Sequence, residues 1–226
     1  MAKRKGKKKK KRINARPLLY LLVVFSIFYL LDSYSTGIFK TVESGQKIGT
    51  GSASKDIVTR VKDNYGSEAD RCAAEFNLPA SYLKSLIILE SSGKKPAGSR
   101  FEKHVYQKLK QVRSGSLKSF EHITQAELKD ASDEALKNLA TSWGPFQIMG
   151  YKCIHLKISL SNLRNDKAVY YGSKWINMTY GDYLRKGKYR DSFHIHNTGH
   201  PYPTIGPSRT YDPNYVPRGL RYMKSF

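Results

Sequence analysis

The feature that constrains this chain most is an uncharged run near its beginning, PLLYLLVVFSIFYLL, which extends over 15 residues from Pro17 to Leu31. A helix of this length rises about 22 Å, and flanking residues can extend it toward the ~30 Å of a bilayer core. The 16 residues before the run contain ten lysines and arginines and no acid. Because basic residues stay on the cytoplasmic side of a membrane, the pattern predicts a single-pass anchor with a cytoplasmic N-terminus.

The rest of the chain is then expected outside the cytoplasm, behind a linker rich in Gly, Ser and Thr. Two other interpretations stay open. The run also fits a cleaved signal peptide, since Ser33 and Ser35 form a small-x-small pair after it, and it fits a core helix of a soluble protein. We expect four parts: a basic cytoplasmic tail (1–16), a transmembrane signal-anchor (17–39), a flexible linker (40–55) and one folded domain (56–226).

Net charge and cysteine content narrow the classes of partner and of site. Of the formal charge of +22, about +12 remains outside the basic tail. The partner is therefore expected to be anionic, such as a nucleic acid, a lipid surface or a cell-wall polymer. The two cysteines, Cys72 and Cys153, are too few for a metal motif or a dense disulfide framework. They form either one bridge outside the cytoplasm or two ordinary core thiols.

Apolar residues in the folded domain recur at helical spacing, and no long alternating strand pattern stands out. In one segment Thr124 is followed by Glu127, which fits a capping box. The fold class predicted is mainly α, with an ordered loop around a short final helix in the last 27 residues. The predicted helices begin near Asp56 and near Leu78, and extend over Thr124–Ala140 and Asn165–Tyr180.

A carboxylate continues the apolar face of the second of these helices. The predicted helix buries Leu83, Leu86 and Ile87, and Glu90 lies on the same face near the C-terminal end. Burial and the negative end of the helix dipole both disfavour the charged carboxylate. A protonated carboxyl group is what general-acid cleavage of a glycosidic bond requires. The alternative is a half-exposed glutamate at a frayed helix end.

Two further motifs carry polar side chains. In ATSWGPFQIMG (140–150), two glycines bracket an aromatic turn whose single amide, Gln147, suits sugar recognition; a plain buried turn is the alternative. In HIHNTG (194–199), the paired histidines suggest a metal, but no third ligand follows at a characteristic spacing. We therefore expect no metal and no cofactor, and interpret Asn197-Thr198-Gly199 as a polar loop that reaches into a cleft.

The order of these motifs resembles the lysozyme-like superfamily. The chain is most similar to phage-endolysin type N-acetylmuramidases and, more distantly, to soluble lytic transglycosylases and goose-type lysozymes. The resemblance covers residues from about Asp56 to Phe226, although His196 stands where the transglycosylases usually have tyrosine. The motifs are Glu-Ser-Ser-Gly (90–93), Arg-Phe-Glu-Lys-His (100–104), Ser-Trp-Gly-Pro-Phe-Gln-Ile-Met-Gly (142–150), His-Asn-Thr-Gly (196–199) and Tyr-Val (215–216).

This resemblance implies an all-α lysozyme-like catalytic domain that cuts the β-1,4 bond between N-acetylmuramic acid and N-acetylglucosamine. It implies that Glu90 is the catalytic acid. The substrate-binding residues that it implies are Ser91, Trp143, Phe146, Gln147, Asn197 and Tyr215.

A glycosidase usually needs a second carboxylate. The candidate is Glu102, from its place in the Arg-Phe-Glu-Lys-His stretch; the alternative is a surface ion pair with Arg100 or Lys103. Asp191 and Asp133 are weaker candidates. With a second carboxylate, hydrolysis is favoured over the transglycosylation that the resemblance also allows.

The partners expected are peptidoglycan glycan strands, the membrane through residues 17–39, and a cell-envelope complex. The catalytic domain is expected to face outward from the cell membrane. A non-catalytic wall-binding scaffold on the same fold is a second class of function. A nucleic-acid binder is a third, but no nucleic-acid motif supports it.

Overall fold

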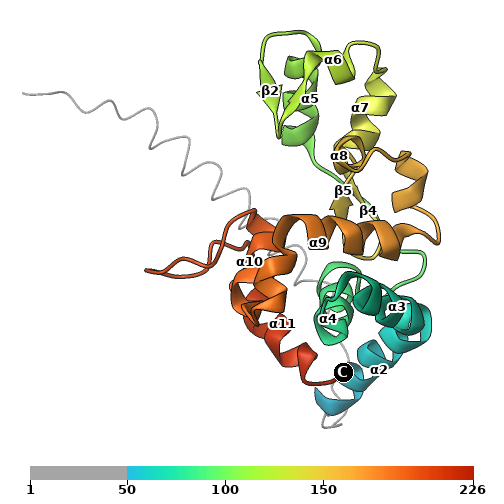
Figure 1. Ribbon diagram of the computed structural model, residues 1–226, viewed down its shortest axis with the longest axis vertical. Coiled ribbons are helices and arrows are strands. Elements are labelled where there is room, and N and C mark those ends of the chain that lie inside the picture. The colour runs from blue at the N-terminus through green and yellow to red at the C-terminus, as the bar shows by residue number, and fades with distance from the viewer. Residues whose placement is uncertain (1–49) are drawn as a thin grey trace, which may run out of the picture. The chain divides into compact units, whose positions relative to one another are not determined.

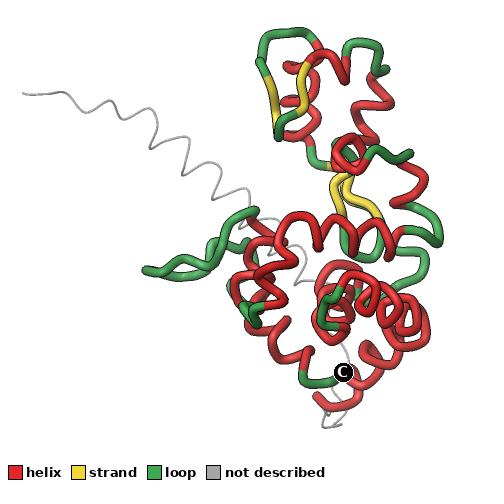
Figure 2. Tube along the Cα trace, in the orientation of Figure 1, coloured by secondary structure: helices red, strands yellow, loops and turns green. Residues whose placement is uncertain are grey.

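The computed structural model describes residues 50–226, which are mainly helical, as the periodicity predicted (Figures 1 and 2). The predicted anchor over residues 17–39 lies outside the described residues, as does most of the predicted linker. Helix α2 (Thr50–Val61) begins within the last part of that linker range. Within residues 50–226, no helix combines the length and the apolar character that a membrane span needs.

The larger group of helices packs around α4 (Ala80–Ser91), the helix that carries Glu90. The three residues predicted on its buried face, Leu83, Leu86 and Ile87, are fully buried. The main core of the domain therefore lies around this helix. The helices packed around it, directly or through one another, are α2, α3 (Ser67–Phe76), α9 (Ala168–Arg185), α10 (Tyr189–Thr198) and α11 (Tyr215–Met223), with a π-helical turn at Lys62–Gly66.

A smaller group of elements has a core of its own, formed by side chains such as Leu109, Ile123 and Leu136. It consists of α5 (Lys103–Arg113), the hairpin β2 (Ser119–Phe120) and β3 (Ile123–Thr124), α6 (Gln125–Leu128) and α7 (Asp133–Leu139). The capping box of Thr124 and Glu127 is confirmed. The single helix predicted over 124–140 was wrong, because α6 ends after one turn and a new helix begins at Asp133. The Ser132 hydroxyl caps this helix by accepting the backbone N–H of Ala135.

A small antiparallel sheet connects the two groups, with strand order β1–β4–β5 (Figure 1). Its strands are β1 (Arg100–Phe101), β4 (Thr141–Trp143) and β5 (Ile148–Met149), followed by α8 (Lys152–Leu156) and a 3₁₀ turn at Leu160–Leu163.

The turn between β4 and β5 packs on α9 through Phe146. A Cβ atom at Gly172 would lie 2.4 Å from the Phe146 ring, so only glycine admits this close approach. Gly144 and Gln147 have positive φ angles of 74° and 49°. The contact between Phe146 and Gly172 therefore fixes the position of the turn on α9.

The structure also bears on two other predictions, the polar loop near the end of HIHNTG and the state of the two cysteines. The polar loop predicted over 197–199 was wrong, because Asn197 and Thr198 belong to helix α10 and only Gly199 follows it. Cys72 and Cys153 are buried free thiols rather than a bridge. Burial raises the pKa of the Cys153 thiol to about 11, which keeps it protonated and unreactive.

Candidate active site

A cleft of about 590 Å³ lies between the two groups of helices. Three of the predicted site residues line it: Glu102 at the start of α5, Gln147 from the β4–β5 turn, and Asn197 from α10. These side chains are 45 and 50 residues apart in the sequence, so the sheet and the packing of α10 against α9 bring them together. The volume lies within the usual range for ligand sites, about 300–1,000 Å³.

Glu90 lies in the last turn of α4, beside residues that line the cleft. Its side chain is 15% exposed, which leaves it accessible, and its Oε1 lies 3.8 Å from Nε2 of His196. The hydroxyl of Tyr215 donates a hydrogen bond to the same oxygen. Within residues 50–226, no lysine or arginine forms an ion pair with this carboxyl group. Its hydrogen-bond donor among the described side chains is therefore the Tyr215 hydroxyl, and His196 is a neighbour beyond hydrogen-bond distance.

The tyrosines around Glu90 stay protonated. Burial raises the pKa of Tyr215 well above its ordinary value, and the charge of Glu90 raises it further. Burial likewise raises the pKa of Tyr180. Near neutral pH both phenols are therefore hydrogen-bond donors rather than phenolates.

Gln147 and Asn197 differ in what they offer a ligand. The Gln147 amide is already engaged: Oε1 accepts from the Ser142 hydroxyl at 2.8 Å, and Nε2 donates to the Gly98 carbonyl at 2.8 Å and to the Gly144 carbonyl at 3.0 Å. Gln147 therefore holds the turn and the loop before β1 together. The exposed amide of Asn197 has no hydrogen bond to any other described residue, so it is free to bind a ligand.

Glu102 both lies in the cleft and forms the ion pair with Arg100 that was the alternative interpretation. It lines the cleft, and its carboxylate pairs with Arg100 at 2.6 Å and lies 3.6 Å from Nδ1 of His104. The two weaker candidates lie outside the lining of the cleft. Asp133 is bound by Arg113 in the smaller group of helices, and Asp191 accepts the backbone N–H of Tyr202.

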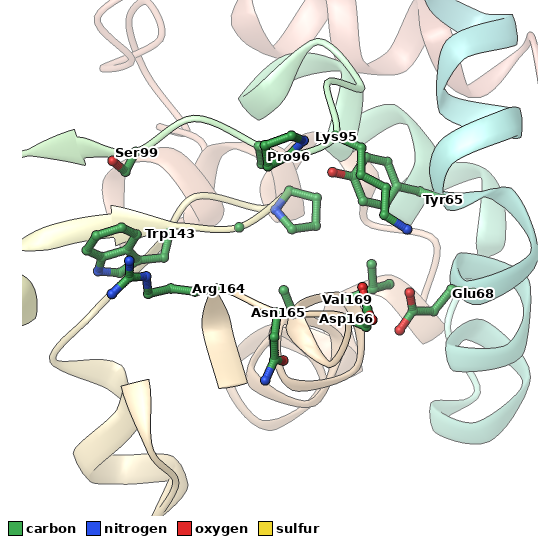
Figure 3. Close-up of a pocket in the computed structure, with 14 residues that line it drawn as sticks. Tyr65, Glu68, Lys95, Pro96, Ser99, Trp143, Arg164, Asn165, Asp166 and Val169 are labelled. Atoms are coloured by element: carbon green, nitrogen blue, oxygen red, sulfur yellow. The ribbon is translucent and has the colours of Figure 1, made fainter. Parts of the chain in front are cut away.

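Trp143, Phe146 and Ser91 do not line the cleft. Trp143 lines a second hollow of about 420 Å³, where Arg164 lies over its indole ring at 4.5 Å (Figure 3). Glu68 and Lys95 line the same hollow, which shares no lining residue with the cleft. Phe146 is fully buried, and the Ser91 hydroxyl donates to the Ile87 carbonyl of its own helix.

The cleft also contains residues that the sequence analysis did not select. The ammonium group of Lys152 lies 4.6 Å from the ring centroids of both Tyr151 and Trp175, and 2.9 Å from a Glu121 oxygen. Trp175 of α9 packs partly against the core and also lines the cleft. No local signal marks Lys152, because its neighbours in the cleft come from other segments.

Among the residues that the structure describes, no three His, Cys, Asp or Glu side chains gather as metal ligands would. The two histidines of α10 use their ring nitrogens for hydrogen bonds to the protein.

Comparison with protein families and with curated proteins gives no match to this chain. Among solved structures, the crystal structure of the Burkholderia AP3 phage endolysin is similar, with a TM-score of 0.48 and 19% sequence identity. The similarity covers 71% of this chain and 69% of that chain.

Proposed function

We propose that this protein is a peptidoglycan hydrolase that cuts the β-1,4 bond between N-acetylmuramic acid and N-acetylglucosamine. The observation that carries the proposal is the position of Glu90, a mostly buried carboxyl group beside an open cleft, with neutral donors and no lysine or arginine partner among the described residues. A carboxyl group in such surroundings suits a general acid that protonates the leaving oxygen of a glycosidic bond.

Glu102 is the proposed second carboxylate. It lines the cleft with Gln147 and Asn197, and its carboxylate forms an ion pair with Arg100. An ionised carboxylate is what a glycosidase needs opposite its acid, either to activate water or to attack the sugar. Two carboxyl groups in these roles support hydrolysis as the reaction.

Where the enzyme acts is part of the proposal. The uncharged run over 17–31, directly after the basic tail, supports a membrane anchor with the catalytic domain outside the cytoplasm. The positive charge of the remaining chain suits an anionic wall polymer. Deleting residues 1–39 is expected to release the protein from membranes into the soluble fraction. A deletion variant that still sediments with the membranes would contradict the anchor.

The role of Glu90 is tested by the rate at which the full chain releases soluble fragments from purified peptidoglycan. We expect Glu90→Gln to lower this rate by about 10³-fold, within the range that general acid catalysis contributes. Glu134→Gln, at an exposed position of α7 outside the cleft, is the matched control and should keep full activity. Near-normal activity of Glu90→Gln, with an unchanged circular dichroism spectrum, would reject the proposal.

A further inference from the structure

His196 makes a defined hydrogen bond with each of its ring nitrogens. Nε2 lies 3.0 Å from the backbone carbonyl oxygen of Phe146, and Nδ1 lies 2.7 Å from the hydroxyl of Tyr180. The side chain is 8% exposed, so water does not compete freely for either nitrogen.

These contacts fix which nitrogen carries the proton. A carbonyl oxygen only accepts hydrogen bonds, so Nε2 must be the N–H donor. In a neutral ring Nδ1 is then an acceptor, and the Tyr180 hydroxyl donates to it. The Tyr82 hydroxyl in turn lies 3.4 Å from the Tyr180 oxygen. The chain therefore has one direction, from Tyr82 through Tyr180 and His196 to Phe146, and every donor in it has an acceptor.

The neighbouring histidine of the same motif has the opposite tautomer. Nδ1 of His194 lies 2.7 Å from the His200 carbonyl and must donate to it, while Nε2 accepts the backbone N–H of Arg209 at 3.1 Å. His194 thereby joins the two ends of the loop between residues 200 and 209. The contrast shows that the proton position at each ring is set by its own backbone partners.

His196 connects the parts of the cleft that surround Glu90. The Phe146 carbonyl belongs to the turn that carries Gln147. Tyr180 lines the cleft and sits where α9 is interrupted, at φ −142° and ψ 21°. The ring of His196 itself lies 3.8 Å from Oε1 of Glu90. One imidazole thus joins α10, α9 and the β4–β5 turn at the proposed acid.

We infer that His196 is a positioning residue, which as a neutral Nε2–H imidazole fixes the β4–β5 turn and Tyr180 around Glu90, and whose protonation disables the site. The inference rests on the proposed role of Glu90. A second proton, on Nδ1, would displace the hydrogen that Tyr180 donates. The resulting imidazolium would also favour the carboxylate form of Glu90, which cannot act as an acid.

Four groups of the described residues face the ring of His196, directly or through a hydrogen bond. They are Glu90 from α4, Tyr180 from α9, the Phe146 carbonyl from the turn, and Tyr215 from α11 through its bond to Glu90. No lysine or arginine of the described residues forms an ion pair with Glu90. Protonation of His196 would therefore be the main change of charge next to this carboxyl group.

The tautomer is tested directly by long-range ¹H–¹⁵N spectroscopy of the full chain with ¹⁵N-labelled histidine at neutral pH. The signals of His196 are assigned by their loss in His196→Gln. We expect a protonated Nε2 and an unprotonated Nδ1 for His196, and the reverse for His194. A protonated Nδ1 or a mixture of tautomers at His196 would overturn the inference, whether or not Glu90 proves to be catalytic.

The positioning role is tested by two substitutions assayed on purified peptidoglycan. His196→Gln keeps an amide donor near the Phe146 carbonyl but has no titrating group, so we expect most of kcat to remain and the loss of rate toward acidic pH to diminish. His196→Leu removes both hydrogen bonds, and kcat should fall about 10- to 100-fold with a smaller change in KM. His200→Gln, an exposed neighbour outside the cleft lining, is the control. Wild-type kcat in His196→Leu, or an unchanged pH profile in His196→Gln, would overturn the proposal.

Discussion

The surroundings of Glu90 and Glu102 differ in almost every respect. Glu90 lies at the C-terminal end of α4, where the Tyr215 hydroxyl donates to it and His196, a residue that lines the cleft, lies 3.8 Å away. Glu102 lines the cleft itself, directly precedes the first residue of α5 and pairs with Arg100. One carboxyl group has a neutral hydroxyl as its donor, and the other has a guanidinium.

The two carboxyl groups also occupy opposite ends of their helices. Glu90 lies in the last turn of α4, whereas Glu102 is the residue before the first turn of α5. Pairs of carboxyl groups in contrasting environments are how glycosidases divide the roles of acid and base. The comparison therefore points to two cooperating carboxyl groups rather than to Glu90 alone.

Removing the charge of Glu102 tests most strongly whether this second carboxyl group is needed. We expect Glu102→Gln to lower kcat on purified peptidoglycan about 100-fold, because the other carboxylate in the lining of the cleft, Glu121, is paired with Lys152. Glu134→Gln serves again as the control for loss of a surface carboxylate. A Glu102 variant that works at the wild-type rate would leave Glu90 as the only carboxyl group needed.

Removing the Tyr215 hydroxyl tests the contribution of the neutral donor beside Glu90. Tyr215→Phe keeps the ring that packs in the core but leaves the Glu90 oxygen without its phenol partner. We expect kcat to fall about tenfold, and the free energy of unfolding to fall by about 1 kcal/mol, as for one net hydrogen bond. Steady-state kinetics and chemical denaturation measure the two effects. A lower free energy of unfolding with an unchanged kcat would assign Tyr215 a structural role only.

Removing the cation beside Glu102 should have a smaller effect. In Arg100→Gln, Glu102 loses its ion-pair partner, so we expect kcat on purified peptidoglycan to fall less than in Tyr215→Phe. Because the Arg100 side chain is 80% exposed, salt screens this pair, and the difference from the wild type should shrink at high ionic strength. Rates measured at low and high salt test this prediction. A difference that grows with ionic strength would contradict it.

The smallest effect is expected in the second hollow. Trp143 and Arg164 line that hollow and not the cleft, so Arg164→Gln should change KM for peptidoglycan by less than about twofold, as for a surface substitution away from the site. A large rise in KM would show that the substrate reaches beyond the cleft into this hollow.

The α4 environment of Glu90 was predictable because it depends on local periodicity. Leu83, Leu86 and Ile87 lie at helical spacing, and all three are fully buried as predicted. Glu90 follows them by one turn, so its place at the edge of the core followed from the same pattern. The capping box at Thr124 was predictable for the same reason, since both partners lie within one turn.

What depends on distant contacts was not predictable. Tyr215 is 125 residues from Glu90, and although the resemblance placed both residues in one site, their hydrogen bond does not follow from the local sequence of either. The motif His194–Gly199 has too few apolar residues to show a helical period, yet Phe193 and packing against α9 keep it helical. Trp143 was expected near the sugar cleft, but the residue spacing does not show to which side of strand β4 its ring points.

The claim that two carboxyl groups act together is tested most directly by the products of the reaction. The full chain is incubated with purified peptidoglycan in ¹⁸O-labelled water, and the released fragments are analysed by mass spectrometry. Hydrolysis predicts a reducing N-acetylmuramic acid end that contains one oxygen atom from water. A 1,6-anhydro end without the label would contradict the account, because the sugar's own hydroxyl would then have taken the place of water.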